Sequence, residues 1–168
     1  SQRAVLNWDT FNVGQSASVH FSQPNAQAVT LNRVNDANPS QIFGKINAPG
    51  QVTLINPAGV YFGRSAVLDV GAVTATTMSQ TDDNFMAGKA DFARNGSTGA
   101  VVNEGSIRTA LGGYVALLAP QVRNEGLIVA RQGTVVLAGG EAIALSFDSA
   151  SKLASLTVSP SLIATLVE

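Results

Sequence analysis

The amino-acid sequence predicts an all-β fold, a parallel β-helix in which coils of about 20–21 residues stack on one another. The first observation is a repeat, because the segment Val102–Ile107 returns as Arg123–Ile128, 21 positions later, with Asn-Glu-Gly in both copies. The second is that a strand of the form Gly-x-Val-x-Leu follows each copy, at Gly113–Leu117 and Gly133–Leu137. Leucine-rich repeats have a different pattern and helical repeats need about 33 residues or more, so a β-helix is the solenoid that remains.

The composition limits the classes of function. The chain has 168 residues, of which 45% are hydrophobic and 12% charged, and this fits one domain with a sizeable core and a neutral polar surface. It contains no cysteine and one histidine, His20, which excludes disulfides, thiolate metal sites, cysteine nucleophiles and His-rich zinc sites. A net charge of -1 argues against nucleic-acid binding. The sequence predicts no catalytic residue, metal or cofactor.

Residues 1–35 show no clear repeat but hold the single tryptophan, Trp8, together with Phe11 and Phe21. The open end of a solenoid must be covered to keep its apolar interior away from water. We therefore expect residues 1–35 to form an N-terminal cap.

Residues 36–76 are expected to form the first coils, with turns at Asn38-Pro39 and at Asn56-Pro57-Ala58-Gly59. Between these turns lies another Gly-x-Val-x-Leu strand, Gly50–Leu54, which precedes the one at Gly113 by 63 residues, or three times 21. Both Asn-Pro segments are turns by composition alone, and both are candidates for a functional role.

Residues 77–98 are polar and break the repeat, so we expect an insertion that loops off the solenoid. Within it, Asp82 and Asp83 precede Phe85 and Met86, which predicts one short helix with an aspartate at its N-cap. The two aspartates could instead help to bind calcium, but they lack the spaced oxygen ligands of a calcium loop.

Residues 99–168 are expected to form regular coils, cut off at the C-terminus, and the whole chain has room for at most eight coils. The apolar end Leu166–Glu168 has no polar cover, so the natural protein is expected to continue. Alternation along the strands predicts which side chains point inward. They are Val101, Ile107, Thr109, Val115 and Leu117 in one coil, and Val122, Ile128, Ala130, Val135 and Leu137 directly above them.

Asn103 and Asn124 are expected at equivalent bends of successive coils, each followed two residues later by a glycine, Gly105 or Gly126. Asparagine tolerates the backbone of a sharp bend, and its side chain can hydrogen-bond the adjacent coil. We therefore expect these asparagines to form part of a vertical stack.

Longer motifs resemble a known family, the secretion domain of filamentous haemagglutinin-like exoproteins. Leu6–Gly14 resembles the opening of that domain, and Leu31–Val34 and Asn38–Gly44 are also similar to it. Gly50–Gly63 resembles its most recognisable segment, and Gly112–Leu118 with the two Asn-Glu-Gly turns continues the match.

The resemblance implies an N-terminal two-partner secretion domain that an outer-membrane β-barrel transporter of a Gram-negative bacterium recognises through its periplasmic domains. The exoprotein would cross the outer membrane unfolded and fold outside as a right-handed parallel β-helix. Because a one-dimensional repeat lets folding propagate coil by coil, we also expect this domain to nucleate the folding. It would be secreted or exposed at the cell surface, and its remaining part could contact host or bacterial cells. The resemblance assigns secretion to Asn56-Pro57-Ala58-Gly59, although the family usually has asparagine where Ala58 stands, and to Asn38-Pro39 as a weaker second motif.

Two other functions stay open on the sequence alone. The domain could itself be an adhesin module that binds glycans or cells. It could also be a carbohydrate-active β-helix enzyme, because Glu104 and Glu125 lie one coil apart, a spacing similar to that of a retaining glycosidase pair. Both glutamates, however, occupy predicted turns that face solvent, and His20 is expected to be an outward strand residue.

Overall fold

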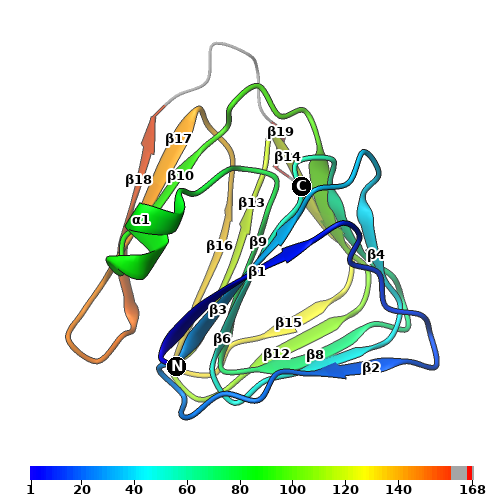
Figure 1. Cartoon of the computed structure of the whole chain (residues 1–168), viewed down its shortest axis with the longest axis horizontal. Coiled ribbons are helices and arrows are strands. Elements are labelled where there is room, and N and C mark those ends of the chain that lie inside the picture. The colour runs from blue at the N-terminus through cyan, green and yellow to red at the C-terminus, as the bar shows by residue number, and fades with distance from the viewer. Residues whose placement is uncertain (160–165, 168) are drawn as a thin grey trace.

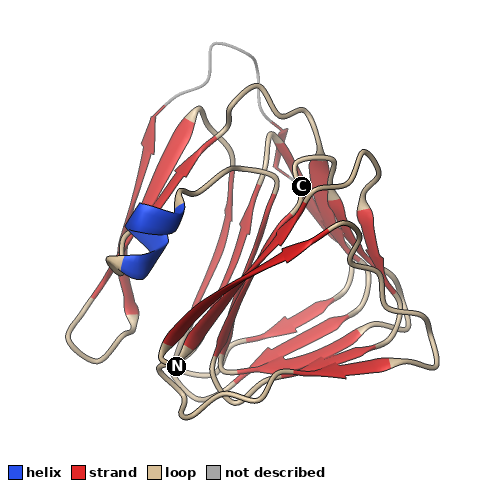
Figure 2. Cartoon of the chain, in the orientation of Figure 1, coloured by secondary structure: helices blue, strands red, loops and turns tan. Residues whose placement is uncertain are grey.

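The computed structural model describes residues 1–159 and 166–167, and it shows a solenoid with three parallel sheets as its sides (Figures 1 and 2). Sheet A contains β1 (Arg3–Trp8), β3 (Val29–Val34), β6 (Gln51–Ile55), β9 (Ala72–Thr76), β13 (Tyr114–Leu118) and β16 (Thr134–Ala138). Sheet B contains β4 (Ser40–Ile42), β7 (Val60–Phe62), β11 (Ala100–Asn103), β14 (Gln121–Asn124) and β19 (Leu166–Val167). Sheet C contains β2 (Ser18–His20), β5 (Lys45–Asn47), β8 (Val67–Val70), β12 (Ser106–Thr109) and β15 (Leu127–Val129). The prediction of an all-β parallel β-helix is confirmed.

Each coil runs through sheets B, C and A in turn, and like side chains meet vertically. Val115 of β13 lies opposite Val73 below it and Val135 above it in the register of sheet A. Val101 likewise meets Val122 in sheet B, and Ile107 meets Ile128 in sheet C. These columns fill the interior with stacked aliphatic side chains, each of which stabilises the fold by about 1.5–3 kcal/mol when fully buried.

The inner column is less buried toward the end of the stack. Val101, Ile107, Val115, Leu117 and Val122 are all completely buried. Val135, in the last strand of sheet A, remains 45% exposed, because within the described part of the chain no further strand lies on β16. At this end of the stack, a side chain in the inner column can therefore still be exposed to solvent.

The strand at Gly50–Leu54 lies closer to the strand at Gly113 than the 63 residues between them suggest. Val52 pairs with Val73, and Val73 pairs with Val115, so β6 and β13 are only two strands apart in sheet A. Two of the three 21-residue intervals between these strands are therefore coils. The third corresponds to the segment between β9 and β11, which adds no strand to sheet A.

Residues 1–35 form the start of the stack. Their strands β1 and β3 pair in sheet A, while β2 pairs with β5 in sheet C. Phe11 and Phe21 are buried at this end, and the Trp8 and Phe11 rings meet edge to face at 5.3 Å. These residues thus contribute strands to the parallel sheets, and their function as a cap stays a prediction.

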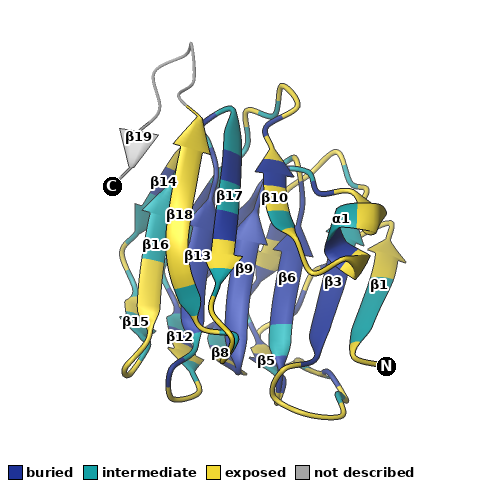
Figure 3. Ribbon diagram, turned by 90° about the vertical axis from the view of Figure 1, so that its left-hand side faces the viewer, coloured by how far each residue is buried: buried dark blue, intermediate teal, exposed yellow. Residues whose placement is uncertain are grey.

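A second layer lies on the outer face of sheet A, and we call it the strap (Figure 3). It consists of residues 82–93 and 142–159, which form α1 (Asp82–Met86), β10 (Ala90–Ala93), β17 (Ala142–Phe147) and β18 (Leu153–Ser159). The three strands are antiparallel, in the order β10-β17-β18. Sheet A therefore has apolar side chains on both faces, with one core inside the solenoid and an outer core under the strap.

The strap corrects three expectations. The predicted regular coils at 99–168 are wrong for residues 142–159, which form an antiparallel hairpin instead. The segment 77–98 is the predicted insertion outside the coils, but it packs back on sheet A instead of looping away, because Phe85 and Phe92 are buried in the outer core. The short helix is present, but its N-cap is Thr81, whose hydroxyl accepts from the backbone N–H of Asn84 at 3.1 Å.

Over the described residues, no helix has the length and apolar character needed to span a membrane.

Candidate functional site

The turn Asn56–Gly59 joins β6 to β7, and the side chain of its first residue shapes it. The backbone N–H of Gly59 donates to the carbonyl of Asn56 at 3.0 Å, which closes a four-residue turn. Asn56 Oδ1 accepts from the backbone N–H of Ala58 at 2.9 Å. The turn thus uses the side chain of residue 56 but only the backbone of residue 58, so an alanine at position 58 is compatible with it.

The same asparagine side chain connects the two Asn-Pro segments. Asn56 Nδ2 donates to the carbonyl of Asn38 at 3.1 Å and to the hydroxyl of Ser40 at 3.0 Å. In return, the backbone N–H of Ser40 donates to the carbonyl of Gly59 at 3.0 Å. The structure therefore brings together two turns that the sequence separates by 18 positions.

Gly59 fits this contact because it has no side chain. Its φ of 136° lies in a region that other residues rarely adopt. A Cβ atom there would lie 3.1 Å from the carbonyl oxygen of Ala100 and 3.3 Å from Cβ of Pro39. Glycine therefore lets the turns pack closely.

Burial separates the motif residues into two groups. Asn56 and Ser40 are completely buried, whereas Asn38, Pro39 and Pro57 are exposed and Ala58 is half-buried. The structure thus presents an exposed pair of proline-containing turns that a buried amide holds in place.

Two grooves adjoin the pair. One has a volume of about 430 Å³ and lies beside Asn38 and Pro39, with Val13 and Phe43 in its wall. The other, of about 410 Å³, is lined by Pro57 and by Trp8, a residue that is 36% exposed. The Asn-Pro turns therefore belong to a larger surface that includes the start of the chain.

Sequence patterns did not identify two hydroxyl groups of this site. Ser40 accepts from Asn56, and Ser97 donates through its hydroxyl to the carbonyl of Pro57 at 2.8 Å. Their partners lie 16 and 40 positions away. These contacts depend on which distant segments lie side by side in the fold, and a local motif carries no sign of them.

The second predicted group, at the Asn-Glu-Gly bends, forms an asparagine ladder. Asn103 Nδ2 donates to Asn124 Oδ1 at 2.9 Å. The Oδ1 atoms of the two asparagines also accept from the backbone N–H groups of Gly105, at 3.1 Å, and Gly126, at 3.3 Å. The ladder ties successive coils together at the bend between sheets B and C.

The two glutamates of the enzyme alternative have separate partners. Glu104 accepts a hydrogen bond from the hydroxyl of Tyr61, and this bond raises the pKa of Tyr61 above its ordinary value. Glu125 forms an ion pair with Arg123 at 3.3 Å. His20 is exposed in β2, and the described residues contain no group of three metal-ligating side chains. This geometry favours neither catalysis nor metal binding.

Known proteins resemble this chain over most of its length. The family model of the TPS secretion domain matches residues 1–165. A heme/hemopexin-binding protein of Haemophilus influenzae strain Rd is 37% identical over 142 residues, which is 80% of this chain and 16% of that protein. Another heme/hemopexin-binding protein of Haemophilus influenzae is 38% identical over 105 residues, covering 62% of this chain and 11% of its own length. The chain thus spans less than a fifth of either relative.

The crystal structure of the HMW1 secretion domain from Haemophilus influenzae has the same fold, with a TM-score of 0.84 and 28% sequence identity. The match covers 98% of this chain and 45% of that one. These likenesses are to secretion domains and to exoproteins that carry them, and the matched family is not an enzyme family. The chain therefore belongs to the TPS, or two-partner secretion, secretion-domain family, whose members direct exoproteins of Gram-negative bacteria to outer-membrane transporters.

Proposed function

We propose that this domain is the export signal and folding nucleus of a longer exoprotein, and that its transporter binds the Asn38-Pro39 and Asn56–Gly59 segments before they pair. The observation that carries this proposal is the complete burial of Asn56 in the folded domain, where its amide bonds Asn38 and Ser40. The expected partner surface is the periplasmic region of the cognate outer-membrane transporter.

The burial of Asn56 supports recognition before folding is complete. Its amide reaches Asn38 and Ser40 only when β4 and β7 lie side by side in sheet B. In an extended chain the two motifs are separate, and the Asn56 amide is free to bond a partner. A transporter that hydrogen-bonds this amide must therefore bind the chain before these coils close. When they close, the amide bonds Asn38 and Ser40 instead.

The solenoid also suits folding from a nucleus. Each coil pairs mainly with its neighbours, so a first pair of coils gives the next one a template. The absence of cysteine from the sequence is consistent with this, because no disulfide can close a loop before the chain crosses the membrane. The exported protein would then lie outside the cell or at its surface, where its remaining part could meet host or bacterial cells.

A binding experiment tests the proposal. The purified periplasmic region of the transporter is titrated with the domain, either folded or freshly diluted from denaturant. We expect tighter binding to the unfolded form and weaker binding of that form after Asn56→Ala. Asn103→Ala is the matched control, since Asn103 is an equally buried asparagine of another bend. Equal binding of folded and unfolded protein, or equal effects of the two substitutions, would contradict the proposal.

A further inference from the structure

The outer face of sheet A depends on segments that arrive much later in the chain. Its apolar side chains include Leu31, Ile55, Ala116 and Leu118, and all four are almost completely buried. They are covered by strap residues, namely Phe85, Phe92, Ile143 and Leu145. Without the strap, this face would expose apolar side chains on several coils, with Thr53 and Thr74 between them.

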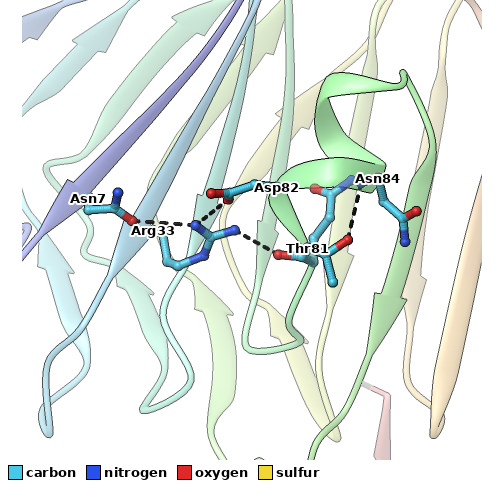
Figure 4. Close-up of polar contacts among 6 residues, drawn as sticks. Asn7, Arg33, Thr81, Asp82 and Asn84 are labelled. Carbon is cyan, nitrogen blue, oxygen red and sulfur yellow. Dashed lines mark hydrogen bonds and ion pairs between the residues drawn. The ribbon is translucent and has the colours of Figure 1, made fainter.

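At the start of the stack, two arginines fasten the strap. Arg33 of β3 forms an ion pair with Asp82 at 2.7 Å and donates to the carbonyl of Gln80 at 2.7 Å (Figure 4). Arg3 of β1 donates through Nε to the carbonyl of Phe85 at 2.6 Å, and its guanidinium lies 4.4 Å from the centre of the Phe85 ring. The helix α1 is thus attached to the first two strands of sheet A.

The other end of the strap contacts late coils. The ring of Phe147 in β17 lies 5.2 Å from that of Tyr114 in β13. Val136 and Ala138 of β16 pack against the same outer core. The strap therefore links the first coil to the last described ones, whereas within sheet A each strand pairs only with its neighbours.

The two halves of the strap meet across a long stretch of sequence. Ala93 in β10 pairs with Ala142 in β17, and next to them Arg94 forms an ion pair with Glu141 at 2.8 Å. The Arg94 side chain is only 7% exposed, and its backbone N–H donates to the carbonyl of Glu141 at 2.8 Å. In a chain that emerges with its N-terminus first, β10 must wait for residues 141–145.

From this arrangement we propose that the strap is a closing device, which converts a stack of coils that could separate one by one into a single cooperative unit. Coils up to β16 can assemble first, and the hairpin of β17 and β18 then closes the outer core and joins the two ends of the stack. The expected timing during export rests on the proposed function. The cooperative coupling does not, because it is a property of the folded domain.

Unfolding of the purified 168-residue chain in urea tests the coupling with two probes. The fluorescence of Trp8, the only tryptophan, reports on the first coil, and far-ultraviolet circular dichroism reports on all strands. In the natural sequence we expect the two transitions to coincide. After Arg94→Ala or the milder Glu141→Gln, the Trp8 transition should shift to lower urea and separate from the other. Arg123→Ala is the matched control, because it removes an arginine–glutamate pair outside the strap.

A crosslink keeps the test decisive if Arg94→Ala folds poorly. Ala93 and Ala142 lie directly opposite each other, and the adjacent Arg94–Glu141 pair is hydrogen-bonded, so a disulfide between cysteines at 93 and 142 fits the ladder. Oxidation of this pair in the Arg94→Ala background should restore coincident transitions, and reduction should separate them again. Coincident transitions in Arg94→Ala and Glu141→Gln alike, or no rescue on oxidation, would overturn the proposal. Either result would leave transporter recognition untouched, since no transporter is present.

Discussion

Asn56 uses its whole amide group, and this makes it the most sensitive residue of the Asn-Pro pair. Replacement by alanine removes two donated hydrogen bonds and the accepted one from Ala58, and it leaves the buried hydroxyl of Ser40 without that partner. We expect Asn56→Ala to lower the free energy of unfolding by about 2 kcal/mol, as measured by urea denaturation. Asn38→Ala, at an exposed position, should change it by less than about 0.5 kcal/mol. Similar losses for both variants would argue against this assignment.

Alanine substitutions at Gly59 and Gly96 distinguish two costs of adding a side chain, namely backbone strain and crowding by neighbouring atoms. Gly59→Ala should destabilise the domain by about 2 kcal/mol, since the new methyl group meets both an unfavourable φ and the neighbouring turn. Gly96→Ala should cost about half as much, because Gly96 has a positive φ but no atom within 4 Å of the added group. Thermal denaturation of both variants measures the difference, and equal shifts would show that the contact with Pro39 is unimportant.

Tyr114 makes stability depend on pH in the alkaline range. Its burial raises the pKa of its hydroxyl from 10.0 to about 12, so folding favours the protonated form. This contribution is fully present below pH 10.0 and is lost as the pH rises toward about 12. We therefore expect the free energy of unfolding to fall over this range, and Tyr114→Phe to make it fall less steeply. An unchanged slope in Tyr114→Phe would assign the effect to another group.

At the scale of elements, the short helix shows what a local sequence pattern can and cannot predict. Its position could be predicted from Phe85 and Met86 after a polar segment, yet the cap is Thr81 and not an aspartate. Both residue types are good N-caps, and the choice depends on backbone angles that the sequence does not specify.

The cap assignment gives a direct prediction for α1. Thr81→Ala should lower the free energy of unfolding by about 1 kcal/mol, while Thr81→Ser, which keeps the hydroxyl, should retain most of the stability. Denaturation curves of the two variants provide the comparison. A loss in Thr81→Ser as large as that in Thr81→Ala would point to the methyl group instead of the cap.

The β17–β18 hairpin could not be recognised because its residues alternate like those of a coil strand. Ile143 and Leu145 point into the outer core, just as Val115 and Leu117 point into the inner one. What distinguishes the two cases is the partner strand, and this is a long-range property. One available sign was that no Asn-Glu-Gly bend follows β16, so the repeat had already stopped.

At the scale of the whole molecule, the repeat predicted the solenoid and the vertical pairing of Val115 with Val135, because one coil determines the next. The strap and the union of the two Asn-Pro turns could not be predicted in this way. Both depend on contacts between segments that do not repeat, such as Arg94 with Glu141 and Asn56 with Asn38. Family resemblance identified the motif residues, whereas only the fold shows that they form one surface.

Secretion of the full-length exoprotein is the most direct test of the central claim that the transporter binds the two Asn-Pro segments. The fraction released into the medium is compared for the natural sequence, Asn56→Ala and the matched Asn103→Ala in cells that produce the cognate transporter. We expect at least about a tenfold lower released fraction for Asn56→Ala, which corresponds to one lost recognition contact, with the protein retained in the periplasm. Asn103→Ala should be released normally. Equal release of the two variants would contradict the claim.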